Sequence, residues 1–365
     1  MKSNIAWWQP EVGREEQERV RQVIADNYIN EGGVTDEFER RIAELVGARH
    51  GVAVTSGTAA IYLSLFAVGV RPGDEVIVPD ITFVATANAA AMAGATPVLV
   101  DVDPATLNMS IPALEAAITP RTKAVVPVHV SGRGADMEAI LRLCDARGIA
   151  VVEDAAEALC SRHKGRALGT FGKAGCFSFS PNKTITTGQG GIVVTNDDNL
   201  HGILRQLKDQ GRPVRGTGGD DLHPALGFNF KLTNLQAAVG LGQLEKLDVR
   251  LERIRRTYAI YRDALANVSS IRILPFAIDD GEQPQWVDAI ADRRNELDAF
   301  LAGRGAGCRR FWFPIHTQKP YLRSDVAFPN STHLCRSAIW LPSSFQMTDE
   351  DARHVATLIR EFYGA

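Results

Sequence analysis

The chain has 365 residues, of which 45% are hydrophobic and 23% charged, the composition of a globular protein that can bury a large core. Its formal net charge of −3 argues against nucleic acid as a partner. The five cysteines form no C-x-x-C pair, so neither a disulfide framework nor a metal site is predicted. The start of the chain lacks a secretory apolar stretch and the run 89–100 is too short to span a bilayer, so we expect a cytoplasmic protein without a membrane partner.

Short apolar runs rich in Val and Ile alternate with helical patterns through the first two thirds of the chain. The strand candidates are VAVT near 52, EVIVP near 75, TPVLVDV near 96, KAVVPVHV near 123, IAVVED near 149, CFSFS near 176 and GIVVTND near 191. Helical patterns follow residues 58 and 134. This alternation predicts an α/β fold with a mostly parallel central sheet that is covered on both faces.

The pattern changes near Lys246, where apolar residues step by three and four along 247–265 with arginines between them. A long helix is predicted there, followed by helices at 293–301 and after Asp349. We therefore expect a large domain over 1–245, which includes the N-terminal segment, and a small C-terminal α+β domain over 246–365.

Two strand ends carry polar residues at the edge where open α/β sheets bind ligands. Ser56-Gly57-Thr58 leaves the first strand and opens a helix, where hydroxyls and backbone N–H groups would form a phosphate cradle, although an ordinary N-cap is an equally good interpretation. Asp154 follows the strand near 149. It could be a magnesium ligand, a ribose contact, a cap or the partner of a protonated heterocycle, and the residues alone leave these alternatives open.

A third strand end leads into the run 177–191, FSFSPNKTITTGQGG, which contains Lys183. A lysine on its own in such a loop would be interpreted as solvent-exposed, because charged lysines belong in water unless a site needs them. The order of cradle, carboxylate and lysine changes that interpretation. A phosphate site, a pyridinium partner and a Schiff-base amine are the three fixtures that pyridoxal phosphate (PLP) requires.

Beyond these residues, the sequence resembles the DegT/StrS-type sugar aminotransferases, a family of fold-type-I PLP enzymes, and in particular their perosamine-synthase-like branch. The resemblance rests on the SGT turn, P-x-x-T-F-x-A-T-A-N at 79–88, P-V-H at 127–129, E-D-A-A-E at 153–157, S-F-x-x-x-K at 178–183 with the following G-x-G-G, and G-F-N-F-K-x-T-N-x-Q-A-A at 227–238. Two departures stand out. Gln189 replaces the usual glutamate of the family, and the segment between Val268 and Arg310 is shorter than is common.

The resemblance implies an aspartate-aminotransferase-like fold with a large PLP-binding domain and a small domain. It implies that Lys183 forms the Schiff base and shuttles a proton, and that Asp154 keeps the pyridine nitrogen protonated. The other cofactor contacts that it implies are Ser56, Gly57, Thr58 and Ser178 at the phosphate, Phe83 on the ring face, Glu157 near the ring hydroxyl, and Asn229 at the phosphate of the neighbouring subunit in a homodimer with shared active sites. Phe83 in an apolar stretch could also be a core residue.

The implied reaction moves an amino group from glutamate to a keto or aldehyde sugar, with a nucleotide-linked 4-keto-6-deoxy sugar preferred and an oxidised octulosonate or a cyclitol left open. Such a reaction belongs to amino-sugar synthesis for surface polysaccharide or a natural product. The substrate candidates are His129, Arg310 and His316, with Arg212 and Arg215 as further ligands for a carboxylate or diphosphate. His129 could equally be a satisfied core histidine.

Two rival functions remain. A sugar 3-dehydratase on the same fold is one, but the resemblance implies a histidine there in place of Lys183. The other is a regulator or scaffold that keeps the fold without turnover.

Overall fold

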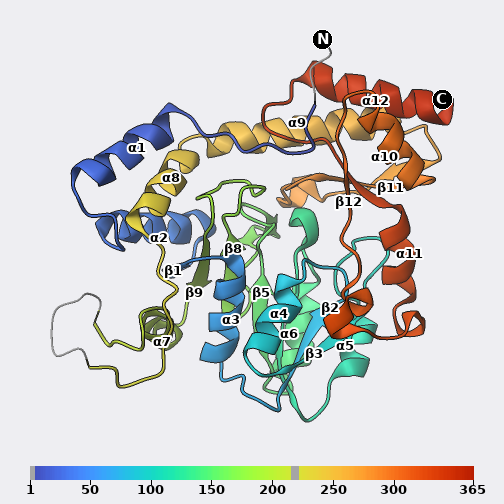
Figure 1. Cartoon of the computed structure of the whole chain (residues 1–365). Coiled ribbons are helices and arrows are strands. Elements are labelled where there is room, and N and C mark those ends of the chain that lie inside the picture. Colours follow the sequence, from blue (N-terminus) through green and yellow to red (C-terminus); the bar gives the residue numbers. More distant parts are fainter. Residues whose placement is uncertain (1–4, 215–221) are drawn as a thin grey trace.

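The computed structural model of the chain describes residues 5–214 and 222–365. A seven-stranded sheet with the order β1-β9-β8-β5-β4-β2-β3 forms its centre (Figure 1). The strands are β1 (His50–Val54), β2 (Glu75–Pro79), β3 (Thr96–Val100), β4 (Thr122–Val125), β5 (Ala150–Asp154), β8 (Ala174–Ser178) and β9 (Gly191–Thr195). All pairs from β3 to β8 are parallel, while β9 is antiparallel to both of its neighbours. The mostly parallel sheet is therefore confirmed, and each strand candidate coincides with one of its strands.

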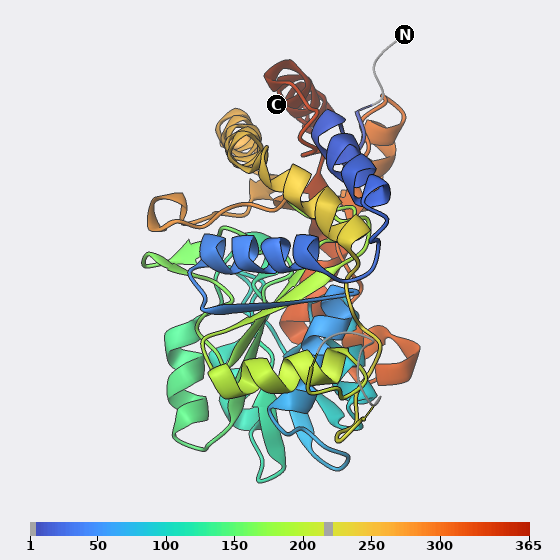
Figure 2. The ribbon, with the colours of Figure 1, turned by 90° about the vertical axis from the view of Figure 1, so that its left-hand side faces the viewer.

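Helices cover both faces of this sheet. Successive side chains of a strand point to opposite faces, and the apolar side chains on each face pack against helices. One face packs on α3 (Gly57–Ala67), α4 (Ala85–Met92) and α7 (Asp198–Lys208). The other packs on α2 (Gly33–Val46) and α8 (Asn234–Leu244) over β1, β8 and β9, and on α5 (Ile111–Ala117) and α6 (Met137–Asp145) over the remaining strands. Figure 2 shows α2 and α7 on opposite sides of the sheet.

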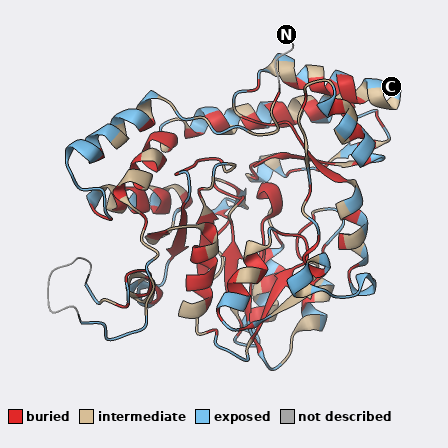
Figure 3. Ribbon diagram, viewed as in Figure 1, coloured by how far each residue is buried: buried red, intermediate tan, exposed pale blue. Residues whose placement is uncertain are grey.

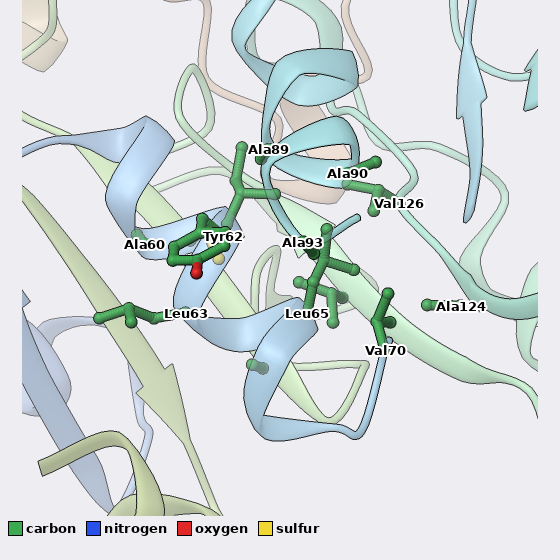
Figure 4. Close-up of a cluster of buried hydrophobic side chains, with 14 of the residues drawn as sticks. Ala60, Tyr62, Leu63, Leu65, Val70, Ala89, Ala90, Ala93, Ala124 and Val126 are labelled. Carbon is green, nitrogen blue, oxygen red and sulfur yellow. The ribbon is translucent and has the colours of Figure 1, made fainter. Parts of the chain in front are cut away.

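Helix α3 is apolar around its whole circumference, as expected of a helix that is surrounded by protein. Leu63 and Leu65 of α3 lie in one buried cluster with Ala89 and Ala90 of α4 and with Val126 beside the sheet (Figure 4). Burial is densest in the sheet and in α3, while the outer helices carry exposed faces (Figure 3). The position of α3 matters for the site, because its first turn lies at the carboxyl edge of the sheet.

The C-terminal part contains an antiparallel sheet of order β10-β11-β13-β12. Its strands are β10 (Ile271–Ile273), β11 (Val287–Ala291), β12 (Arg309–Arg310) and β13 (Ala338–Leu341), and its helices are α9 (Leu247–Leu265), α10 (Arg294–Ala302), α11 (Pro329–Ser337) and α12 (Asp349–Tyr363). Helices α9 and α12 lie side by side (Figure 1). The predicted helices and the α+β character are confirmed; the proposed boundary at 245/246 falls between α8 and α9 and stays a prediction.

The N-terminal segment precedes α1 (Arg14–Ala25) and forms backbone hydrogen bonds with the C-terminal part of the chain. The amide of Ile5 donates to the Gly305 carbonyl at 2.8 Å, and the amide of Gly307 donates to the Ile5 carbonyl at 2.8 Å. Ile5 is buried in the hydrophobic core of the C-terminal part. Ile5 thus pairs with 305–307, while the indole N–H of Trp8 donates to the Pro181 carbonyl at 3.1 Å, so the assignment of the segment to the large domain stays a prediction.

A short hairpin, β6 (Arg162–His163) with β7 (Arg166–Ala167), follows the strand that ends at Asp154. Over residues 5–214 and 222–365, no helix has the length and apolar character that crossing a membrane requires.

Candidate active site

A cavity of about 450 Å³ lies at the carboxyl ends of β1, β5 and β8. Eight of the predicted cofactor residues line it: Ser56, Gly57, Thr58, Phe83, Asp154, Glu157, Ser178 and Lys183. Gln189, Trp286, Arg309 and Trp312 line it as well. Segments that are far apart in the sequence thus meet at the edge of the sheet where ligands of open α/β folds bind.

The first turn of α3 forms one wall of the cavity. Ser56 is the N-cap of this helix, and its hydroxyl accepts a hydrogen bond from the Ala59 amide at 3.1 Å. A Cβ atom on Gly57 would lie 2.9 Å from the Cβ of Ser178, so only glycine lets the helix start approach β8 so closely. Ser56 can therefore be the N-cap and also part of a phosphate cradle. A helix N-terminus attracts anions even when one of its N–H groups is bonded to the N-cap residue.

Asp154 ends β5 and is 5% exposed. Its carboxylate accepts hydrogen bonds from the Thr86 hydroxyl at 2.7 Å and from the Ala156 amide at 3.2 Å. Burial raises the pKa of Asp154, and the bond from Thr86 is the main opposing influence. A cationic partner in the cavity would favour the ionised form, as a protonated pyridine nitrogen does.

Lys183 and Glu157 also line the cavity and form a largely buried ion pair. The Nζ of Lys183 lies 3.2 Å from Glu157 Oε1, with the lysine side chain 11% exposed, and 5.0 Å from the centroid of the Trp286 ring. The second oxygen of Glu157 accepts from the Ser131 amide at 2.9 Å. Burial raises the pKa of Glu157, and the charge of Lys183 is the main influence that opposes this. The amine is therefore held in place at the cavity rather than in solvent.

A model of the DegT/DnrJ/EryC1/StrS aminotransferase family matches residues 10–360. The chain belongs to this family. It is similar to two proteins described as GDP-perosamine synthase: one from Escherichia coli O157:H7, 37% identical over 98% of each chain, and one from Caulobacter vibrioides, 39% identical over 95% of each chain.

Among solved structures, the chain resembles the protein Spr1654 from Streptococcus pneumoniae in its PLP form, with a TM-score of 0.93 and 25% identity over 99% of each chain. The expected aspartate-aminotransferase-like fold and the PLP cofactor are thereby confirmed. The protein is a PLP-dependent sugar aminotransferase, which excludes the scaffold without turnover.

Arg309 is a cavity residue of this aminotransferase that the sequence analysis missed. Its guanidinium carbon lies 4.9 Å from the ring centroid of Trp7 and 5.4 Å from that of Trp340. Arg310, the residue chosen from the sequence, does not line the cavity; it is half exposed and pairs with Asp298 at 2.9 Å. Adjacent residues of a strand point to opposite sides, so only one of the two arginines can face inward.

The two candidate histidines lie outside the cavity lining. His129 is completely buried: its Nδ1 accepts from the Ala135 amide at 3.1 Å, so Nε2 carries the proton of the neutral ring and donates to Glu153 at 2.9 Å. The sequence left two interpretations open, a substrate contact and a buried core histidine. The burial of His129 and the partners of both ring nitrogens favour the core histidine. His316 is also buried. Its Nδ1 lies 2.6 Å from Asp80 Oδ2 and its Nε2 lies 3.2 Å from Asp325 Oδ1.

Asn229 and Arg212 do not line the cavity of their own chain. Asn229 is exposed and forms a backbone bridge with Asp209. Arg212 lies 3.7 Å from Asp209. Arg215 falls outside the described residues.

Proposed function

We propose that this aminotransferase moves the amino group of glutamate to a nucleotide-linked 4-keto-6-deoxy sugar, with Lys183 as the amine that holds PLP. The observation that carries the proposal is the meeting of Lys183, Asp154 and the start of α3 around one cavity. These are an amine, a carboxylate and an anion-binding helix start, which match the aldehyde, the ring nitrogen and the phosphate of the cofactor.

The remaining lining residues also fit the group. Ser178 and Thr58 place hydroxyls beside the start of α3, and the exposed ring of Phe83 offers an aromatic face in the cavity wall. When bound, PLP supplies an electron sink for the negative charge that forms when the amino-bearing carbon loses its proton. Asp154 would keep a proton on the ring nitrogen through its charge, and Thr86 fixes the orientation of that carboxylate.

Lys183 has the position of the group that moves the proton. Glu157 and the Trp286 ring hold its amine beside the cavity, where a free amine would be within reach of the reacting carbon. The indoles of Trp286 and Trp312 line the same space and reduce the access of water to that carbon.

The identity of the acceptor is supported by the relatives rather than by the cavity. Both relatives named above act, by their names, in the synthesis of GDP-perosamine, and each covers at least 95% of this chain. For that reason we favour a nucleotide-linked keto sugar over an octulosonate or cyclitol acceptor.

We also propose a homodimer in which Asn229 reaches the phosphate site of the neighbouring subunit. Asn229 is exposed and lies outside the cavity lining of its own chain, which is the arrangement that such a contact requires.

Reduction with borohydride followed by peptide mapping tests the cofactor attachment: the adduct is expected on Lys183. Incubation with glutamate and a panel of nucleotide-linked keto sugars, with detection of 2-oxoglutarate, tests the reaction. An adduct on another lysine, or no 2-oxoglutarate with any acceptor of the panel, would contradict the proposal.

Lys183→Ala is expected to lower the single-turnover rate by at least about 1,000-fold, because the proton-transfer group is lost. The variant should still bind the cofactor through the phosphate site. Lys173→Ala is the matched control, since Lys173 is exposed and does not line the cavity. Equal rates for Lys183→Ala and the parent would refute the role of Lys183.

A further inference from the structure

Arg309 is a cavity cation that no carboxylate of the described residues holds in an ion pair. Within residues 5–214 and 222–365, its guanidinium makes no ion pair or hydrogen bond, whereas Lys183 pairs with Glu157 and Arg310 pairs with Asp298. Burial lowers the pKa of Arg309, and the charge of Glu157 opposes this. A partly desolvated guanidinium that lacks an acceptor lowers stability, so its presence at a ligand cavity indicates that a ligand supplies the anion.

Two indoles hold Arg309 without using its hydrogen-bond donors. Trp340 faces it across the β12–β13 pair, and Trp7 reaches it from the N-terminal segment, which is fixed by the backbone bonds of Ile5 to 305–307. Cation–π contacts of this kind occupy the face of the guanidinium and leave the N–H groups of its edge available. The result is a preoriented fork that suits a planar, bidentate anion such as a carboxylate.

Arg309 lies on the side of the cavity where the reacting amine lies. Lys183 contacts the Trp286 ring, whose centroid is 5.6 Å from that of Trp7 and 4.9 Å from that of Trp340. Trp7 and Trp340 are the two rings that hold Arg309. Glu157 links the same two cations, because it touches Lys183 and its charge influences Arg309.

The two substrates differ in where they carry negative charge. In an amino acid, the α-carboxylate is bonded to the carbon that carries the amino group, so it must bind close to the reacting amine. A nucleotide-linked 4-keto sugar has no anion next to its keto carbon, and its diphosphate is attached at C1. We infer that Arg309 binds the α-carboxylate of the amino donor through a bidentate ion pair, an assignment that rests on the proposed glutamate-dependent function.

The inference predicts that Arg309 affects one half-reaction and not the other. In the PLP form of Arg309→Gln, the dissociation constant of glutamate is expected to rise about 100-fold, as follows from the loss of charge-assisted hydrogen bonds. Calorimetric titration of the PLP form with 2-oxoglutarate, which does not react with it, should show a similar loss. Reaction of the pyridoxamine phosphate form with the keto sugar should change by less than about threefold.

A second donor separates the carboxylate contact from general damage. 4-Aminobutyrate lacks a carboxylate on its amino-bearing carbon, so the preference of the parent enzyme for glutamate over this amine should fall about 100-fold in Arg309→Gln. Arg309→Lys, which keeps a charge but not the fork, should retain an intermediate affinity for 2-oxoglutarate. If Arg309→Gln fails to hold the cofactor, the titration of Arg309→Lys decides, and an unchanged affinity in that variant overturns the inference.

Arg310→Gln is the matched control, because Arg310 is the neighbouring arginine and points away from the cavity to Asp298. It should leave both half-reactions within about twofold of the parent. A larger effect on the keto sugar than on glutamate in Arg309→Gln would assign Arg309 to the acceptor and overturn the inference. If the parent transaminates no keto sugar with glutamate, the proposed function fails; if the parent does and Arg309→Gln retains its glutamate affinity, only the inference fails.

Discussion

Asp154 is a carboxylate that is more useful to the reaction than to the stability of the fold. Its pKa is raised because burial disfavours the ionised form, and a single hydroxyl, that of Thr86, is the largest influence in the other direction. A group whose pKa is higher in the folded than in the unfolded chain contributes stability at pH values below the unfolded pKa. That contribution is lost as the pH rises through the folded pKa.

We therefore expect Asp154→Asn to raise the melting temperature of the cofactor-free protein at pH 8 by about 1–3 °C. The increase should shrink as the pH falls through the raised pKa of Asp154, because the carboxyl group of the parent takes up its proton there. Thermal denaturation of both proteins across this pH range measures the difference. An increase that does not depend on pH would rule out the buried charge as its cause.

The same variant should behave in the opposite way once the cofactor is bound. Asparagine cannot hold a proton on the pyridine nitrogen by charge, so the single-turnover rate with glutamate is expected to fall by about 100-fold or more. A rate within threefold of the parent would contradict the role proposed for Asp154.

The meeting of Ser56, Asp154 and Lys183 at one cavity could be predicted from the sequence, and the presence of Arg309 in the same cavity could not. Asp154 ends a strand, and Ser56 and Lys183 each follow one. The sequence patterns of these strands are clear, so the meeting of the three residues at one sheet edge follows from the topology. Arg309 and Arg310 are neighbours in a strand of two residues, and their side chains point to opposite sides of it. Pairing with β13, about 30 residues further along, decides which arginine faces the cavity.

At the scale of elements, the site depends on the close contact between α3 and the end of β8. Gly57 provides this contact, since any Cβ there would meet the side chain of Ser178. The contact brings the helix start and the Ser178 hydroxyl to the same wall of the cavity.

Gly57→Ala is expected to push the first turn of α3 away from β8 and to weaken PLP binding by about 10-fold, a typical consequence of overpacking. Titration of the cofactor-free variant with PLP gives the affinity. Gly202→Ala in α7 is the control: a Cβ at Gly202 meets nothing within 4 Å, so that variant should bind PLP normally and gain about 0.5–1 kcal/mol of stability. Normal PLP affinity in Gly57→Ala would show that the contact tolerates a methyl group.

Long elements and buried strands were predictable because their patterns repeat over many residues. Helices α9 and α12 keep one apolar face along 19 and 15 residues. The hairpin β6–β7 and the strand β12 have two residues each, too few to show a period, and they exist because of partners elsewhere in the chain. The pairing of Ile5 with 305–307 could not be predicted for the same reason, since the two segments are remote in the sequence.

At the scale of the whole molecule, the proposed sharing of active sites between subunits can be tested by mixing inactive variants. Lys183→Ala and Asn229→Ala are each expected to have low activity as homodimers. In a mixed dimer, one site combines an intact lysine with an intact asparagine. Random pairing should therefore restore about one quarter of the parental activity after co-refolding. No recovery, with mixed dimers demonstrated by differential tags, would place Asn229 outside the site of its partner.

All five tryptophans of the chain, Trp7, Trp8, Trp286, Trp312 and Trp340, lie in one cluster that borders the cavity. Trp286 is the indole that Lys183 contacts, with 5.0 Å between the amine and the ring centroid. A chromophore attached to that amine would therefore lie beside every native fluorophore of this type at once. Binding of the coenzyme should therefore quench the intrinsic tryptophan fluorescence of the protein, which gives a measure of cofactor occupancy without a label. Coenzyme attached to a lysine far from the cluster would leave the fluorescence unquenched.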